Sequence, residues 1–256
     1  MKKIKLIFLV ILICLIFSSI SIYAAIKINS RDIGFTPTNS EWQVDNVEEA
    51  LNELYSNKTK ENSNFVNDAL VVNVDYKNTQ NFIYGINAQI TDEGFLFSGS
   101  NSILLKRFQS DTMSYEVYFK PSAFEGAIIS SEETGGCALI MRSSGLLSGN
   151  CYMNGAYRDI ATEETLGSDK WYHAVLTVGG NGMKLYLNGT LRSSNNYTSF
   201  KENVQNTITT IGCDSVRSEC ESPYFKGNIK MARIYSKELS SEEVKQNYDD
   251  VLNYYK

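Results

Sequence analysis

The chain is poor in residues that several protein classes depend on. It contains one histidine, His173, and three prolines among 256 residues. One histidine argues against a histidine-based metal centre, and three prolines argue against collagen-like or proline-rich disorder. Lysine and arginine number 24 against 29 aspartates and glutamates, a formal net charge of −5. The sequence shows no basic stripe of the kind that binds nucleic acid, so we expect no nucleic-acid partner.

Catalytic motifs are also missing. The sequence has no G-x-S-x-G turn that would expose a nucleophilic serine. A histidine base needs a nucleophile or an orienting carboxylate within about 3 Å, and no motif supplies one to His173. His173 lies in an alternating run between Trp171 and Val175. We therefore interpret it as a structural strand residue rather than as a base or a metal ligand.

Long apolar runs are confined to the amino-terminal end. A lysine-rich start precedes an uncharged stretch from Leu6 to Ile26. A basic start, an apolar centre and small residues at the exit are typical of a secretory signal, but about 20 apolar residues also suffice to cross a bilayer. Residues 1–27 are thus predicted to be a signal peptide or a membrane-anchor helix. Both alternatives place the rest of the protein at the outer face of the cell membrane or in the medium.

Export decides how the cysteines are interpreted. Four lie beyond the apolar run: Cys137, Cys151, Cys213 and Cys220. An even number in an oxidising compartment favours two disulfides. A hairpin between Cys137 and Cys151 would place them opposite each other, and a short polar loop would let Cys213 bond Cys220. The alternatives are a zinc site, for which the C-x-x-C spacing is missing, and four free thiols.

Residues 28–63 are predicted to form a spacer. Apolar side chains recur there at helical spacing, over Val44, Val47, Ala50, Leu51, Leu54 and Tyr55. Asp45 and Glu48 are spaced as a capping box, and the polar run after Tyr55 is typical of a linker. The segment resembles a short unit that follows the signal in exported Firmicutes proteins. A membrane-proximal spacer helix and a docking surface for a partner are the two interpretations.

The remainder, residues 64–256, has the pattern of β structure. Segments such as M-S-Y-E-V-Y-F-K-P alternate and are rich in β-branched and aromatic residues. Asn188-Gly189 between two such runs is a strong tight-hairpin signal. Strands at this spacing, without helices between them, indicate an all-β, antiparallel sandwich of two sheets. Ser240 and Glu243 are spaced as a capping box for a short carboxy-terminal helix.

Four motifs, in order, resemble one known family. They are F-S-G-S at 97–100, W-Y-H-A-V at 171–175, L-Y-L-N-G at 185–189, and a closing pattern made of Phe225, Gly227, Ile229, Arg233, Ile234, Tyr235, Leu239, Ser240, Glu242 and Glu243. Together they resemble the concanavalin A-like, laminin-G-like jelly-roll family over residues 68–252. The resemblance implies a two-sheet jelly roll that binds glycans or proteins, with calcium in some members. It also implies that a histidine at this strand position occurs in non-catalytic members.

A sugar site in such a fold combines an aromatic platform with side chains that hydrogen-bond hydroxyl groups. Seven residues in predicted loops are candidates for ligand binding: Tyr152, Tyr157, Arg158, Asn195, Asn196, Tyr197 and Tyr224. Each tyrosine has an alternative role as a surface side chain that covers a sheet edge.

Calcium is the cofactor that the resemblance raises. Its candidate ligands are Asp75, Asp92 and Asp214 in oxygen-rich loops. Lys230, however, stands where many relatives carry an acidic residue, and its charge would repel an ion held there.

Glycan hydrolases of the same superfamily often carry an E-x-D-x-x-E strand motif, which this sequence does not contain. Glu163 and Glu164 are adjacent acids in a predicted loop. Neighbours on a strand point to opposite faces, so such pairs do not converge readily as hydrolysis requires. We therefore predict an exported, surface-tethered module that binds glycans or a cell-surface protein and catalyses no reaction. The alternatives are a structural or assembly component of the cell surface, and a glycan hydrolase.

Overall fold

The structure is a computed structural model. It describes residues 46–51, 64–78, 83–108, 110–132, 135–198, 208–216 and 219–255, with the backbone alone at 83–86. The chain divides into two compact units, Met1–Asn62 and Ser63–Lys256. The signal or anchor predicted at 1–27 lies outside the described residues. Within the described part of the chain, no helix has the length and apolar character needed to cross a membrane.

The described part of the first unit is a short helix at 47–51. Asn46 precedes it, and its side-chain Oδ1 accepts a hydrogen bond from the backbone nitrogen of Glu49 at 2.9 Å. The carbonyl of Asn46 accepts a second bond from Ala50 at 3.0 Å. This is the geometry of a helix N-cap. Asp45, which the sequence suggested as the cap, lies outside the described residues.

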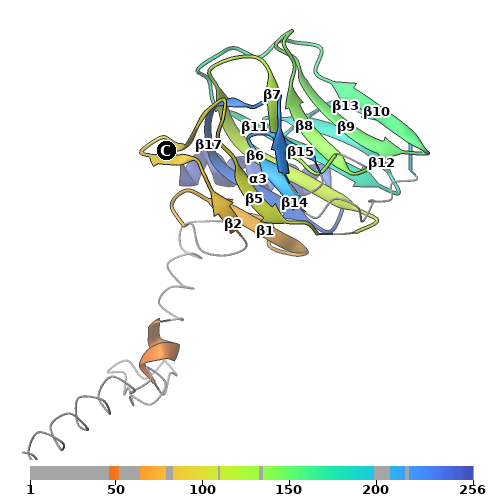
Figure 1. Ribbon diagram of the computed structural model, residues 1–256. Coiled ribbons are helices and arrows are strands. Elements are labelled where there is room, and N and C mark those ends of the chain that lie inside the picture. Colours follow the sequence, from red (N-terminus) through yellow and green to blue (C-terminus); the bar gives the residue numbers. More distant parts are fainter. Residues whose placement is uncertain are drawn as a thin grey trace, which may run out of the picture. The chain divides into compact units, whose positions relative to one another are not determined.

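The second unit contains two large sheets with antiparallel pairing throughout (Figure 1). The eight-stranded sheet has the order β13-β12-β11-β6-β17-β4-β3, and β1 also pairs with β17. Its strands are β1 (Leu70–Asp75), β3 (Gln89–Thr91), β4 (Gly94–Ser98), β6 (Met113–Pro121), β11 (Tyr172–Gly179), β12 (Gly182–Leu187), β13 (Thr190–Asn195) and β17 (Lys226–Tyr235).

The seven-stranded sheet has the order β10-β9-β8-β7-β14-β5-β2. Its strands are β2 (Ile83–Ile86), β5 (Ile103–Lys106), β7 (Gly126–Ser130), β8 (Cys137–Met141), β9 (Leu147–Met153), β10 (Ala156–Ala161) and β14 (Ile208–Ile211). A separate hairpin consists of β15 (Asp214–Val216) and β16 (Glu219–Glu221). The prediction of an all-β, antiparallel two-sheet jelly roll is confirmed.

The two sheets stack because side chains alternate along each strand. On β6, Tyr115, Val117 and Phe119 are buried in the core between the sheets. Glu116 and Tyr118 alternate with them and therefore face the outer side of the eight-stranded sheet. Each strand of this sheet thus contributes to two layers, one between the sheets and one outside them.

Helix α3 (Ser241–Tyr254) covers the outer side of the eight-stranded sheet. It buries Val244 and Val251 against side chains of β6, β11, β12 and β17. The predicted capping box is present, because the Ser240 side chain accepts from the Glu243 nitrogen and the Glu243 carboxylate accepts from the Ser240 nitrogen. The predicted carboxy-terminal helix is confirmed, and it closes one face of the sandwich.

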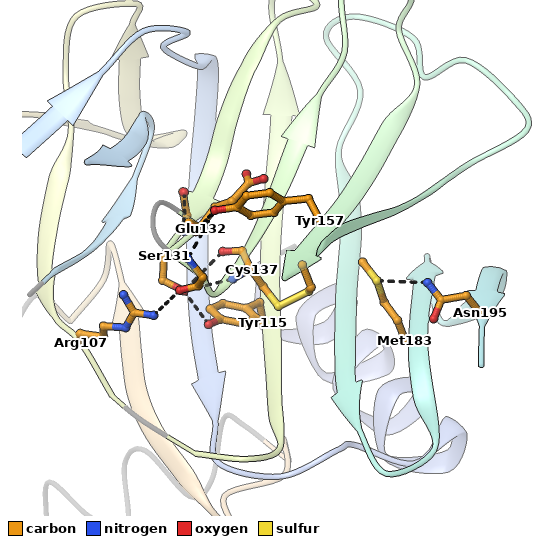
Figure 2. Close-up of a disulfide and its surroundings, with 11 residues drawn as sticks. Arg107, Tyr115, Ser131, Glu132, Cys137, Tyr157, Met183 and Asn195 are labelled. Carbon is orange, nitrogen blue, oxygen red and sulfur yellow. Dashed lines mark hydrogen bonds between the residues drawn. A yellow bond between two sulfur atoms is a disulfide. The ribbon is translucent and has the colours of Figure 1, made fainter. Parts of the chain in front are cut away.

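Both predicted disulfides are present. Cys137 on β8 lies directly opposite Cys151 on β9, and the bond joins the two strands of this hairpin (Figure 2). Cys213, just before β15, is bonded to Cys220 on β16. The zinc and free-thiol alternatives are therefore wrong for these four residues.

Candidate functional site

The single histidine belongs to a buried polar cluster. His173 Nε2 on β11 lies 2.7 Å from Glu116 Oε1 on the neighbouring strand β6. This is the spacing of a base and its orienting carboxylate, a partner that the sequence did not reveal. Both side chains are 0 % exposed, and the ring of Tyr248 on α3 lies 5.7 Å from the histidine ring. A catalytic base must touch its substrate, so this burial supports a structural role for His173.

Glu116 is the centre of this cluster. Its second oxygen, Oε2, accepts hydrogen bonds from Tyr235 OH and Asn247 Nδ2, each at 3.0 Å. Arg233 NH1 lies 3.5 Å from Oε1. Burial alone would raise the pKa of Glu116, but the charge of Arg233 and the bond from His173 hold it below its usual value. The cluster therefore keeps a carboxylate ionised inside the protein.

Arg233 extends the cluster to α3 and to the start of the sandwich. Its guanidinium is buried and lies 3.4 Å from the Asp250 carboxylate on α3. Burial alone would lower the pKa of Arg233, but the Glu116 carboxylate raises it above its usual value. Asn247, also on α3, accepts a hydrogen bond from the Val66 nitrogen at 2.7 Å. The cluster thus fastens α3 and the first residues of the second unit to the eight-stranded sheet.

Two predicted site residues form an exposed aromatic pair. Tyr152 on β9 and Tyr157 on β10 are direct cross-strand neighbours, with ring centroids 5.2 Å apart in an edge-to-face arrangement. They are 37 % and 43 % exposed. Tyr157 OH donates to the Glu132 carbonyl at 2.9 Å and accepts from the Gly135 nitrogen at 3.3 Å (Figure 2). The loop between β7 and β8 therefore fixes the orientation of this ring.

A second group of predicted residues lies where β10 approaches β13. The guanidinium carbon of Arg158 is 4.2 Å from the ring centroid of Tyr197, a cation–π contact. Asn195 Oδ1 accepts from the Tyr197 nitrogen at 3.1 Å, while its Nδ2 donates to Met183 Sδ at 3.6 Å (Figure 2). Asn196 between them is exposed. Strands of the two different sheets therefore bring these residues together.

Six of the seven predicted residues lie in two groups along the edge strand β10. The pair Tyr152 and Tyr157 is on the outer face of the sheet, and Arg158 with Asn195, Asn196 and Tyr197 is on the side that approaches β13. We call the two groups together the tyrosine edge: Tyr152, Tyr157, Arg158, Asn195, Asn196 and Tyr197. The seventh, Tyr224, lies elsewhere, between β16 and β17. Its hydroxyl donates to the carbonyl of Cys220 at 3.3 Å, and its backbone bridges to Ala127 on β7. The structure therefore does not group Tyr224 with the other candidates.

Sequence reasoning missed polar residues beside the aromatic pair. Asp159 on β10 accepts hydrogen bonds from Arg142 and from Ser148 on β9. Asn150, between Ser148 and Tyr152, has a buried Oδ1 without a hydrogen-bond partner among the described residues. Ser148, Asn150 and Tyr152 recur at period two and so share the outer face of β9. That alternation was the signal in the sequence that could have identified them.

The three calcium candidates do not form a site. Asp75 is buried, which raises its pKa, and it accepts from the Lys77 nitrogen at 2.9 Å. Asp214 accepts from Ser130 Oγ at 2.7 Å, and Asp92 lies in the turn between β3 and β4. Over the described ranges, no three His, Cys, Asp or Glu side chains are grouped to hold a metal.

Lys230, whose charge would repel a bound ion, contacts Tyr255 and Trp171. Its ammonium donates to the Tyr255 carbonyl at the end of α3 at 3.2 Å. It also lies 4.6 Å from the ring centroid of Trp171. A cation near the carboxy-terminal end of a helix is favourable because the exposed carbonyls there carry partial negative charge. Lys230 therefore stabilises the position of α3.

Comparison with known families agrees with this geometry. The family model described as the concanavalin A-like lectin/glucanases superfamily, a laminin-G type, matches residues 97–245. The chain belongs to this superfamily. The match covers more than half of the chain and contains the whole tyrosine edge. A search of curated proteins found no match for this member of the superfamily.

Solved structures with the same fold include domains of botulinum neurotoxins. The serotype D ligand binding domain, in complex with N-acetylneuraminic acid, is 22% identical with a TM-score of 0.55, over 72% of this chain and 51% of that chain. The type G receptor binding domain is 16% identical with a TM-score of 0.53, over 71% of this chain and 51% of that chain. This chain therefore matches about half the length of these structures, and the likeness establishes the fold.

Proposed function

We propose that this protein is an exported, surface-tethered module that binds glycans at the tyrosine edge without transforming them. The superfamily includes lectins, and the sandwich has the lectin-like arrangement of two stacked sheets. A fold alone does not fix a function, so the proposal depends on the site.

One observation carries the proposal. Among the described residues, the strongly exposed aromatic side chains are Tyr152, Tyr157 and Tyr197, and all three lie on the tyrosine edge. Tyrosine rings present an apolar face for the carbon skeleton of a sugar and a hydroxyl for its polar groups. The exposed amide of Asn196 adds donors and acceptors of the kind that sugar hydroxyls require, while the amide of Asn195 fixes the backbone at Tyr197.

The acidic groups support binding rather than hydrolysis. Hydrolysis of a glycoside needs two carboxylates that face each other across the substrate. Asp159, beside the aromatic pair, is held by Arg142 and Ser148. Glu116 is fully buried beneath α3. Neither is positioned to protonate or attack a sugar bound at the tyrosine edge.

The predicted export also fits this proposal. The uncharged stretch Leu6–Ile26 supports export, and two disulfides fit an oxidising compartment. The first residues of the sandwich are bonded to α3, on the outer side of the eight-stranded sheet. Tyr152 and Tyr157 lie on the opposite, seven-stranded sheet. The aromatic pair therefore lies on the face of the sandwich that α3 does not cover, where a glycan or a glycosylated surface protein can reach it.

A glycan array tests the proposal. The full chain, solubilised in detergent, is compared with the double variant Y152A/Y157A and with the control Y224A. We expect wild type and Y224A to bind the same glycans, and the double variant to lose roughly tenfold or more in affinity because it lacks the aromatic platform. Equal binding by the double variant, or no glycan bound by wild type, would contradict the proposal.

A further inference from the structure

Arg158 differs from the other arginines that the structure describes. Each of the others has an oxygen partner: Arg107 with the Gly135 carbonyl, Arg142 with Asp159, Arg192 with Glu164, and Arg233 with Glu116 and Asp250. For Arg158 the described residues supply an aromatic ring, that of Tyr197, and no oxygen acceptor. No carboxylate or carbonyl among the described residues therefore accepts a hydrogen bond from its guanidinium.

Part of the Arg158 guanidinium is also withdrawn from water. Its Nε is buried and has no hydrogen-bond partner among the described residues. An arginine stays charged at any physiological pH, and a donor withdrawn from water without an acceptor is destabilising. Tyr197 holds the guanidinium on one face, which leaves its in-plane N–H groups to donate to a further partner. The neighbouring side chain of Asn196 is exposed, so a ligand can reach this end of the tyrosine edge.

We propose that Arg158 binds the carboxylate of an acidic sugar. A guanidinium presents parallel N–H donors at the spacing of two carboxylate oxygens, so it distinguishes a carboxylate from an uncharged hydroxymethyl group. Tyr197 fixes the guanidinium plane and offers its exposed edge to the same sugar. This inference rests on the proposed glycan binding at the tyrosine edge and adds the chemical class of the ligand.

The test uses pairs of glycans that differ in one group. An array carries acidic glycans that end in uronic or sialic acids, each beside its counterpart with the carboxylate reduced to an alcohol, and sulfated counterparts form a third arm. The full chain in detergent is compared with R158Q, R158K and the control R192Q. Arg192 is a suitable control because its charge is paired with Glu164 on the surface at 3.3 Å. Thermal melting shows that each variant is folded.

We expect wild type and R192Q to prefer the carboxylate form, and R158Q to lose roughly tenfold or more of its affinity for that form alone. R158K should retain part of the preference, since it keeps the charge and loses the paired donors. Equal binding of the acidic and reduced forms by wild type would overturn the inference and leave the proposed function standing. A stronger preference for sulfate would overturn the choice of a carboxylate. An array without any bound glycan would remove both proposals.

Discussion

Two arginines of this sandwich have opposite surroundings. Arg233 is fully buried beneath α3, with two carboxylates within 3.5 Å and the ring of Phe65 3.8 Å from its guanidinium carbon. Arg158 lies at the tyrosine edge with an aromatic ring and no carboxylate among its described neighbours. The fold satisfies the first charge completely and leaves the second open. The comparison separates a scaffold, where polar groups fasten elements together, from a surface that we propose is completed by a ligand.

The same contrast distinguishes the two sheets. The outer side of the eight-stranded sheet is closed by α3 through apolar contacts and the Glu116 cluster. At the opposite sheet, Tyr152 and Tyr157 remain exposed. Changes beneath α3 should therefore alter stability and spare binding, and changes at the tyrosine edge should do the reverse.

The largest expected effect is at Glu116. E116Q keeps the volume of the side chain but removes the buried charge that faces Arg233 and receives the bond from His173. We expect the free energy of unfolding to fall by about 3–5 kcal/mol, because one partner of a buried ion pair is left uncompensated. Urea denaturation measures it. D159N, at the exposed pair with Arg142, is the matched control and should cost at most about 1 kcal/mol. An equal loss of unfolding free energy in E116Q and D159N would show that the buried cluster stabilises the fold no more than a surface ion pair does.

Loss of the disulfide between Cys137 and Cys151 should have the second largest effect on stability. Replacing both cysteines by alanine removes a bond that closes a loop of 14 residues' separation, which should cost about 3 kcal/mol. Cys151 lies opposite Arg158 on β10, so this variant should also weaken glycan binding. The disulfide between Cys213 and Cys220 closes a shorter loop. Replacing both of these cysteines by alanine should lower the free energy of unfolding by about 2.5 kcal/mol without affecting glycan binding. Unchanged glycan binding by the variant without Cys137 and Cys151 would show that this disulfide does not support the tyrosine edge.

The pH dependence of stability gives a third test of the scaffold. The pKa of Glu116 is lower in the folded protein than its usual value of 4.5. Such a carboxyl stabilises the folded state above its unfolded pKa, and this stabilisation is lost as the pH falls through the folded pKa. The difference in unfolding free energy between wild type and E116Q should therefore be constant above about pH 5 and shrink at lower pH.

The titration of Asp75 does not affect the difference between wild type and E116Q. Burial raises its pKa, so its contribution changes with pH in the opposite direction, but it is present in both proteins and cancels in the difference. Denaturation series in urea at stepped pH values measure the effect. A difference that stays constant down to about pH 3 would mean that Glu116 does not carry a stabilising charge.

The smallest expected effect is at His173. Glutamine retains a donor that can reach Glu116, so H173Q should cost about 1 kcal/mol in stability. Its glycan affinity should equal that of wild type, because the histidine is buried beneath α3 and away from the tyrosine edge. Loss of binding in a folded H173Q protein would reverse the roles assigned to the two sides of the sandwich.

Much of the fold could be predicted because its signals are local. Alternation predicts the strands, Ser240 and Glu243 predict the start of α3, and the spacing of Cys137 and Cys151 predicts a hairpin that places them opposite each other. Each of these features depends on residues that are close in the sequence. Local pattern and turn chemistry therefore sufficed for them.

The candidate site depends on contacts between strands that are distant in the sequence. The sequence pattern did not predict these contacts. His173 and Glu116 are 57 residues apart and meet through the pairing of β11 with β6. Arg158 and Tyr197 come from different sheets, so no single periodicity relates them. Tyr224 is a tyrosine like Tyr152 and Tyr157, yet the fold places it elsewhere. The prediction that the candidates lie in loops was wrong for Tyr152 on β9, for Tyr157 and Arg158 on β10, and for Asn195 at the end of β13. Side-chain chemistry identified candidates, and only the stacking of the sheets selected among them.

The most direct test of the account is to map where a glycan binds. The full chain in detergent is titrated with the tightest-binding glycan of the array while NMR resonances of tyrosine rings and arginine side chains are followed. The account predicts that Tyr152, Tyr157, Tyr197 and Arg158 shift together, with one affinity, while His173 and Arg233 remain unchanged. Shifts centred on His173, Arg233 or α3, with the tyrosine edge unaffected, would contradict it.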